Sequence, residues 1–331
     1  MKKVRNIIAL VFVLLLALTI VLLIVLLNQS DKKFSITTSE QFIQAMKHSA
    51  DIKKRKEYTL DTDIAVNANA LPKTALDFYG ILNGNGHTLT ISANKKSTLP
   101  KPLFKTIKED AAINMLNIVV DSKVTVGSES GKSDVAVLAN VNSGVISDCT
   151  LTVDAILIGK ECSNAAALVN FNYKEIKNVC VTVRKMQETK KNESWSCRFG
   201  AVSTVNYASV KDVFVDVSFD NGAGERLSVF DSAIDNRYVG YVVGGFEAAE
   251  TTEKTETTAA TSVFQNIIII TKKDESETFR YWTKAADPKV NAPYYERRAY
   301  RDMSTIWNSI QGRWQNWELR SNDSLPVLKK S

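Results

Sequence analysis

The sequence predicts an all-β solenoid, a fold built from stacked copies of one short unit. The main observation is that the stretch 138–153 recurs at 168–183 and again at 202–217. Each copy carries an Asp or Asn followed by residues that alternate between apolar and polar, as in a strand with one buried face. A repeat of roughly 30 residues indicates one supersecondary unit per copy, each stacked on the next. The anchors, including fainter copies on either side, are Asn117, Asp148, Asn178, Asp212 and Asn266.

The chain begins with a segment suited to a membrane. Residues 1–6 contain Lys2, Lys3 and Arg5, and residues 7–27 are apolar with one exception. This run matches the roughly 20 residues that span a bilayer and exceeds the apolar region of a cleavable signal peptide, about 7–15 residues. Basic residues before a span favour an inside amino terminus. We therefore expect a cytoplasmic tail at 1–6, a single-pass signal anchor at 7–27 in the cell membrane, and an extracellular remainder.

The charge argues against a nucleic-acid partner. The formal net charge is +6, and three of the 42 Lys and Arg residues lie in the first six positions. The part expected outside the membrane therefore carries only about +3, which is no electrostatic footprint for nucleic acid.

Four cysteines lie in the part expected outside the cell, where disulfides form. The alignment of the copies puts Cys149 at an inward position and Cys180 at an outward one, so these two should not bond to each other. Cys162 and Cys197 precede their copies by similar distances, and stacked coils lie about 4.8 Å apart, so a Cys162–Cys197 disulfide is predicted. The alternative is a set of unpaired thiols. Their spacing does not resemble a metal site.

A short helix is predicted directly after the membrane segment. Thr38 followed by Gln41 three residues later is a capping box, and apolar residues then share one face of a helix near 38–48. We expect this helix to cover the first coil, because an open sheet end would pair with other chains.

The glycine-rich turn that follows carries a family resemblance. The stretch FYGILNGNGHTL at 78–89 is similar to the opening coil of bacterial cell-surface proteins with GLUG-type repeats, and the copies at 138–153 and 168–183 resemble that family's repeating coil. The resemblance covers residues 34–328. It implies a right-handed, pectate-lyase-like parallel β-helix over residues 28–278. The chain departs from the family where Ala136 and Ala166 replace the glycines that name the repeat.

The alignment also stacks three asparagines, Asn142, Asn172 and Asn206, at one corner of successive coils. Stacked amides hydrogen-bond to one another along a pile of parallel strands. We expect a ladder that stabilises the turns, with ligand binding by these amides as the alternative.

The end of the chain changes in composition. Residues 247–262 interrupt the repeat with a polar stretch that predicts a mobile loop. Residues 279–331 then hold four of the five tryptophans. We expect these aromatics to cap the last coil, because terminal units of a solenoid need a different outer face. The alternative is a platform on which sugars stack. The four are Trp282, Trp307, Trp314 and Trp317.

Residues able to perform catalysis are scarce. His48 and His87 are the only histidines, which leaves little material for a Ser-His-Asp triad or a zinc site. Asp61 and Asp63 lie two apart on one predicted strand, about 6.5–7 Å apart, a spacing compatible with a glycosidase pair, a calcium site or a structural turn. The stretch 127–133 resembles a phosphate-binding loop but is one residue short and continues as a strand. We expect no cofactor and no metal.

These observations predict a membrane-anchored extracellular surface protein that serves as a non-catalytic scaffold for adhesion or for binding a glycan or another surface protein. The expectation rests on the family resemblance and on the scarcity of catalytic residues. The alternative is a carbohydrate-active enzyme, a polysaccharide lyase or a glycosidase, because one fold hosts many functions and parallel β-helices include such enzymes.

Overall fold

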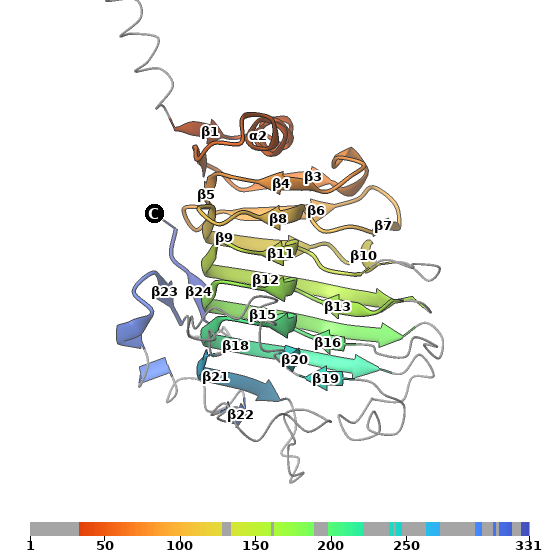
Figure 1. The fold of residues 1–331 in the computed structure, drawn as a ribbon, viewed down its shortest axis with the longest axis vertical. Coiled ribbons are helices and arrows are strands. Elements are labelled where there is room, and N and C mark those ends of the chain that lie inside the picture. The colour runs from red at the N-terminus through yellow and green to blue at the C-terminus, as the bar shows by residue number, and fades with distance from the viewer. Residues whose placement is uncertain are drawn as a thin grey trace, which may run out of the picture. The chain divides into compact units, whose positions relative to one another are not determined.

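The computed structural model contains a parallel β-solenoid preceded by one helix (Figure 1). Ser35–Ser331 form one compact unit and Met1–Phe34 another. No helix in the described part of the chain is long and apolar enough to cross a membrane. The predicted span at 7–27 and the predicted loop at 247–262 lie outside the described residues. The structure describes residues 33–127, 134–159, 162–188, 198–220, 238–240, 243–246, 263–271, 295–299, 307–308, 311–319 and 326–330.

The helix, α2, spans Ser39–Ile52, so it begins where the sequence predicts and continues beyond the expected end at residue 48. The Thr38 hydroxyl accepts a hydrogen bond from the Gln41 N–H, and the Gln41 side chain accepts one from the Thr38 N–H. This confirms the capping box, which satisfies two N–H groups that a helix start otherwise leaves unpaired. The buried face of α2 includes Met46, which is 3% exposed.

Successive coils pair in parallel to form the walls of the solenoid, and Figure 1 shows their strands stacked one above another. Among the described residues, the largest sheet has 13 strands, the second six and the third three. The main path of the largest sheet comprises β1 (Phe34–Ile36), β2 (Glu57–Leu60), β5 (Ile81–Asn83), β9 (Ala112–Val120), β12 (Val145–Ile158), β15 (Glu175–Glu188), β18 (Ser209–Asp220), β21 (Val263–Thr271) and β22 (Tyr295–Ala299).

The remaining strands complete these walls and one short hairpin. Beside the main path of the largest sheet lie β3 (Ile64–Asn67), β6 (Thr88–Ser92), β7 (Ser97–Leu99) and β10 (Val124–Gly127). The second sheet holds β4 (Leu76–Phe78), β8 (Phe104–Ile107), β11 (Ala139–Asn142), β14 (Val169–Asn172), β17 (Ser203–Asn206) and β20 (Val243–Phe246), and the third holds β13 (Asn164–Ala166), β16 (Arg198–Gly200) and β19 (Tyr238–Gly240). The antiparallel hairpin is β23 (Trp317–Glu318) with β24 (Val327–Leu328).

The register between coils is the one that the repeat alignment predicts. Cys149 pairs with Val179, and Thr150 pairs with Cys180. Cys149 is fully buried, whereas Thr150 is only partly buried, as expected when alternate residues face the core. A slip of one residue would turn every buried side chain of a strand outward, so burial holds the register in place.

The Asp and Asn anchors occupy a corner with an unusual backbone. Asp148, Asn178 and Asp212 have φ values of 50°, 51° and 50°, in the left-handed region. Asp and Asn tolerate this region better than other residues with a side chain, because their short polar groups hydrogen-bond locally. The anchors therefore repeat because each coil turns at the same place.

One anchor was assigned wrongly from the sequence. The left-handed residue of the earlier coil is Met115, with φ 51°, and not Asn117. Leu116 pairs with Cys149 and Asn117 pairs with Thr150, so Asn117 lies two positions beyond the corner. Its side chain serves the stack differently. The Asn117 amide donates to the Gly86 carbonyl at 2.7 Å and accepts from the Thr150 hydroxyl at 2.8 Å.

The three stacked asparagines hydrogen-bond in sequence along one corner. Asn142 Nδ2 donates to Asn172 Oδ1 at 2.8 Å, and Asn172 Nδ2 donates to Asn206 Oδ1 at 2.6 Å. All three side chains are fully buried. Buried amides need partners, because an unpaired one loses its hydration without compensation. Their burial also leaves these amides no surface to offer a ligand.

We expect Asn172→Ala to lower the free energy of unfolding by roughly 1–3 kcal/mol, because both neighbouring amides lose a partner while they stay buried. Chemical denaturation of the full chain in detergent measures the change. Thr152→Ala, at an outward position of β12, is the matched control and should cost under about 0.5 kcal/mol. Equal losses in the two variants would contradict a stabilising role for the ladder.

Candidate functional site

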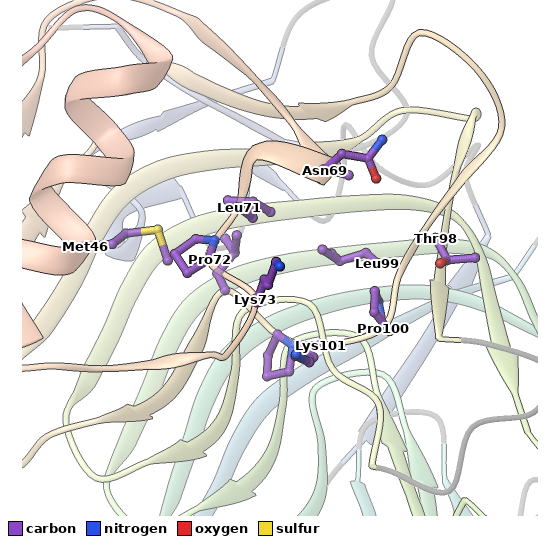
Figure 2. Close-up of a pocket in the computed structure, with 12 residues that line it drawn as sticks. Met46, Asn69, Leu71, Pro72, Lys73, Thr98, Leu99, Pro100 and Lys101 are labelled. Atoms are coloured by element: carbon purple, nitrogen blue, oxygen red, sulfur yellow. The ribbon is translucent and has the colours of Figure 1, made fainter.

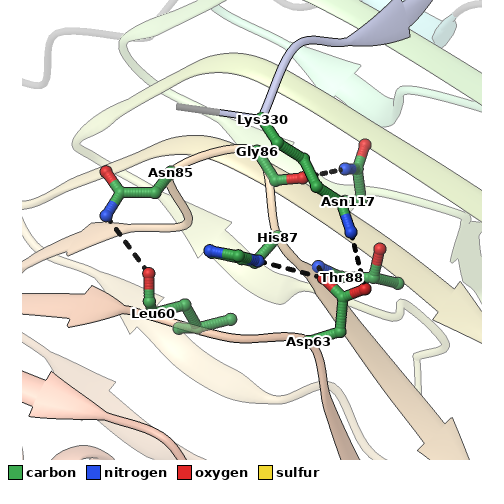
Figure 3. A network of polar contacts seen from close by, with 8 residues as sticks. All are labelled: Leu60, Asp63, Asn85, Gly86, His87, Thr88, Asn117 and Lys330. Atoms are coloured by element: carbon green, nitrogen blue, oxygen red, sulfur yellow. Dashed lines mark hydrogen bonds and ion pairs between the residues drawn. The ribbon is translucent and has the colours of Figure 1, made fainter.

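The predicted carboxylate pair lies in a turn, because the strand expected there divides into β2 and β3. Asp61 accepts a hydrogen bond from the Ser35 hydroxyl. Asp63 contacts a different set of groups, shown in Figure 3. Its carboxylate lies 2.8 Å from Lys330 Nζ and 3.1 Å from His87 Nδ1, and it accepts the Thr88 N–H at 3.0 Å.

These contacts argue against a catalytic role for Asp63. The Lys330 ammonium, which donates to the carboxylate, is the largest cause that lowers the Asp63 pKa to about 2. A glycosidase acid needs a raised pKa to hold its proton near neutral pH. A catalytic triad would also need a Ser hydroxyl or Cys thiol that is hydrogen-bonded to the His87 ring. Among the described residues, no Ser or Cys hydrogen-bonds to that ring. No group of three metal-binding side chains occurs within the described ranges.

The contacts instead hold the end of the chain against the first coils. Gly86, in the glycine-rich turn, has φ 77°, and a Cβ there would come within 2.1 Å of the Lys329 carbonyl oxygen. Only glycine permits both that backbone and that approach. The turn that carries the family resemblance is therefore also where the C-terminal segment packs.

The aromatic tail packs along the side of the solenoid. Trp307, Trp314 and Trp317 are 7%, 1% and 1% exposed, and they form one cluster with Phe214 and Cys180. Cys180 and Phe214 are paired outward positions of β15 and β18. The predicted aromatic cluster at the end of the chain is therefore present, and its described tryptophans cover an outer face of the largest sheet at β15 and β18, which stabilises the fold by burying apolar surface.

Burial also removes these tryptophans from any sugar-stacking platform, since their rings pack edge to face against one another. The Trp314 ring lies 4.9 Å from the Trp317 ring and 5.1 Å from the Phe214 ring, measured between centroids. Trp317 Nε1 donates to Asp148 Oδ1 at 3.0 Å, which links the tail to the corner of β12. The fourth predicted residue, Trp282, lies outside the described residues.

Two cysteines are free and buried for different reasons. Cys149 faces the core, whereas Cys180 faces outward and is covered by the tryptophans. Burial raises the pKa of each thiol to about 12. Such thiols are chemically inert while they stay covered. The Cys162 thiol is also buried and donates to the Asn164 carbonyl; Cys197 lies outside the described residues, so the Cys162–Cys197 disulfide stays a prediction.

One aromatic pair is exposed. The rings of Tyr173 and Tyr207 stack with centroids 4.5 Å apart and planes 3° from parallel. Tyr173 is 49% exposed and is the one large apolar side chain that is exposed within the described ranges. Each tyrosine directly follows a ladder asparagine, Asn172 or Asn206, so its position in the coil is the same. That shared position in the copies could have predicted the stack.

The second candidate site is a cavity of about 420 Å³ beside α2. Figure 2 shows its walls, which come from residues 68–73 of one coil, residues 98–103 of the next, and Met46 of α2. Its lining combines apolar side chains with two lysines, Lys73 and Lys101, and has no carboxylate. Nothing in the sequence singled out these residues, because the cavity forms only when the two loops and the helix come together.

Comparison with known proteins supports the fold and nothing finer. No family model matches the chain. No curated protein matches it either. A crystal structure of a "putative immunoglobulin A1 protease" from Bacteroides ovatus is similar, with a TM-score of 0.52 and 12% identity over 91% of this chain and 93% of that one. At that identity the likeness concerns the β-solenoid alone, and the resemblance to GLUG-type surface proteins stays a prediction from motifs.

The Asp63 contacts make stability depend on pH. Because the pKa of Asp63 is lowered from 3.8 to about 2, its contribution is complete above about pH 4 and is lost as the pH falls toward 2. Asp63 is half-exposed, so the effect should be a modest slope in melting temperature. We expect Lys330→Ala to flatten that slope in melts between pH 2 and pH 4, while Lys329→Ala preserves it. If the melting temperatures of the wild type, Lys330→Ala and Lys329→Ala all depended on pH in the same way, the assignment of this pH dependence to the Asp63–Lys330 contact would be contradicted.

The aromatic cluster should control the reactivity of the Cys180 thiol. Trp314→Ala should raise the rate at which iodoacetamide modifies Cys180 by roughly tenfold or more, because the ring that covers the thiol is removed. Mass spectrometry of peptides from the natively labelled chain locates the modification. Cys149, which the tail does not cover, should stay protected and serves as an internal control. Trp314→Phe, which keeps a ring, should preserve protection; modification of both thiols alike would indicate general unfolding instead.

Proposed function

We propose that this chain is a non-catalytic scaffold displayed on the outer side of a membrane, and that it binds glycans at the corner occupied by Tyr173 and Tyr207. The observation that carries the proposal is the exposed tyrosine stack. The position outside a membrane is supported by the apolar run at 7–27 in the sequence.

The geometry of the stack leaves one ring face open. The ring spacing of 4.5 Å follows the spacing of the coils, so the plane of each ring lies across the direction in which the coils stack. In the coil before Tyr173 the equivalent residue is Ser143, since Asn142 pairs with Asn172. A serine is too small to cover a phenol ring. The face of Tyr173 away from Tyr207 is therefore available to a ligand.

The surroundings suit a sugar. The C–H face of a pyranose packs on an aromatic ring, and its hydroxyls need polar partners beside that ring. Lys174 and Glu175 follow Tyr173 directly. The Lys174 ammonium donates a hydrogen bond to the Glu109 carbonyl, 2.6 Å away. The Glu175 carboxylate lies 3.3 Å from the Lys177 ammonium. These groups offer both donors and acceptors without forming a pair of acids that could cleave a glycosidic bond.

A glycan array probed with the full chain in a neutral detergent tests the proposal. We expect Tyr173→Ala to weaken binding of any glycan that the wild type retains by roughly tenfold or more, because the ring face is lost. Tyr173→Phe keeps the ring and should bind nearly as well. Thr152→Ala changes an outward residue of β12, outside this corner, and is the matched control.

The same material separates binding from catalysis. Retained glycans are incubated with the wild type, and new reducing ends are counted. Binding without product growth supports a scaffold, whereas steady product growth would overturn it in favour of a carbohydrate-active enzyme. An array without any retained glycan would also overturn the proposal and would point to a protein partner.

A further inference from the structure

The cavity beside α2 is large enough to hold a small molecule. Its volume of about 420 Å³ falls within the roughly 300–1,000 Å³ typical of small-molecule sites. It lies between two consecutive coils, near the amino-terminal end of the solenoid, and is separate from the tyrosine stack. The 3-10 helix η1 (Ala68–Ala70) forms one wall, and the connection from β7 to β8 forms the opposite wall.

The walls are held in place before any ligand arrives. Pro72, Pro100 and Pro102 fix φ at three positions of the lining, which limits how far either loop can move. The Ser97 hydroxyl donates to Asn69 Oδ1 at 3.2 Å and so joins the two loops. The Leu103 N–H donates to the Val137 carbonyl at 2.8 Å, which fixes the second loop to the next coil. A site formed in advance costs little ordering entropy on binding.

The most buried side chains of the lining are apolar. Met46, Leu99 and Leu103 are 3%, 4% and 3% exposed, and Leu71 and Pro72 are partly buried beside them. Figure 2 shows Met46 reaching from α2 toward Pro72, with Leu71 and Leu99 coming from the two coils. Methionine adapts its shape to an irregular ligand better than a branched side chain does. The lining has no aromatic ring, so this site differs in chemistry from the sugar site proposed above.

The rim of the cavity is cationic. Lys73 and Lys101 are both exposed and line the same opening, one from each coil. No Asp or Glu contributes to the lining. Two ammonium groups above an apolar floor attract an anion whose remaining atoms avoid water, since charge steers the ligand and burial of its apolar part holds it.

We propose that this cavity binds a small anionic amphiphile, an alkyl or aromatic body that carries one carboxylate, sulfonate or phosphate group. The apolar body lies against Met46, Leu71 and Leu99, and the anionic group lies between Lys73 and Lys101. The ligand is bound without being chemically converted, because the lining offers no acid, thiol or imidazole to react with it.

Isothermal titration calorimetry with naphthalene-2-sulfonate tests the proposal on the full chain in a neutral detergent, after subtraction of a titration into detergent alone. The uncharged isostere 2-naphthalenemethanol is titrated in parallel. We expect the sulfonate to bind more tightly than the alcohol. The double variant Lys73→Ala/Lys101→Ala should weaken sulfonate binding by roughly tenfold or more and leave alcohol binding unchanged, because only the charged group meets the lysines.

The matched control is Lys95→Ala/Lys96→Ala, which removes two exposed lysines that do not line the cavity, and it should bind both probes as the wild type does. Leu71→Gln keeps both lysines and should weaken both probes. Melting temperatures near that of the wild type show that each variant is folded. If Lys73→Ala/Lys101→Ala fails this check, Lys73→Gln/Lys101→Gln replaces it. No heat beyond the detergent reference, equal binding of alcohol and sulfonate, or full binding by the lysine variant would each overturn the proposal.

Discussion

Parallel pairing in register between successive coils is the constraint on which the rest of the structure depends. It places each residue over its equivalent 30 to 34 positions away, as with Asn142, Asn172 and Asn206. Identical side chains then meet in rows, and their chemistry decides what each row does. Buried amides form a hydrogen-bonded ladder, and exposed phenols form a stack. The same repetition puts a left-handed Asp or Asn at one corner of three successive coils, where these residue types tolerate the backbone better than other side chains do.

The C-terminal segment adds a second layer of organisation that the repeat does not contain. It runs back along the solenoid from Trp307 and Trp314, over outer positions of β15 and β18, to Asp148 and finally to Asp63. An outer face of a solenoid wall would otherwise expose Phe214 to water. Its coverage explains why the Phe214 ring and the Cys180 thiol, which face outward, are nevertheless buried. The described part of this segment leaves the tyrosine corner and the cavity beside α2 uncovered, and we assign ligands to these two places.

The two proposed sites follow from different features of a solenoid. The tyrosine corner arises inside the repeat, where equal positions in two coils carry the same residue. The cavity arises where the repeat is least regular, between loops of unlike length next to the helix that covers the first coil. A regular wall gives rows of side chains, and an irregular loop gives concavity. A chain with both can hold an extended ligand on one surface and a compact one in another.

Much of the fold could be predicted because its information is local and repeated. The capping box needs two residues three apart, and the pairing of Cys149 with Val179 needs only an alignment of copies. The failures have a physical reason. Asn117 has the right residue type for the corner, yet the pairing of Leu116 with Cys149 puts Met115, and not Asn117, beside the corner residue Asp148. Asp61 and Asp63 alternate like strand residues, yet the chain turns between β2 and β3.

The sequence by itself determined the parallel solenoid, the inward residues, the amide ladder and the start of the helix, since each of these follows from a short pattern or from its repetition. Only the tertiary structure decided which outward residues are covered. Trp317 and Asp148 are 169 positions apart, and Lys330 and Asp63 are 267 apart. No periodicity links such residues, because their contact depends on where the whole stack ends and on how the remaining chain returns along it. For the same reason the open face of Tyr173 and the cationic rim of the cavity became visible only once the coils were stacked.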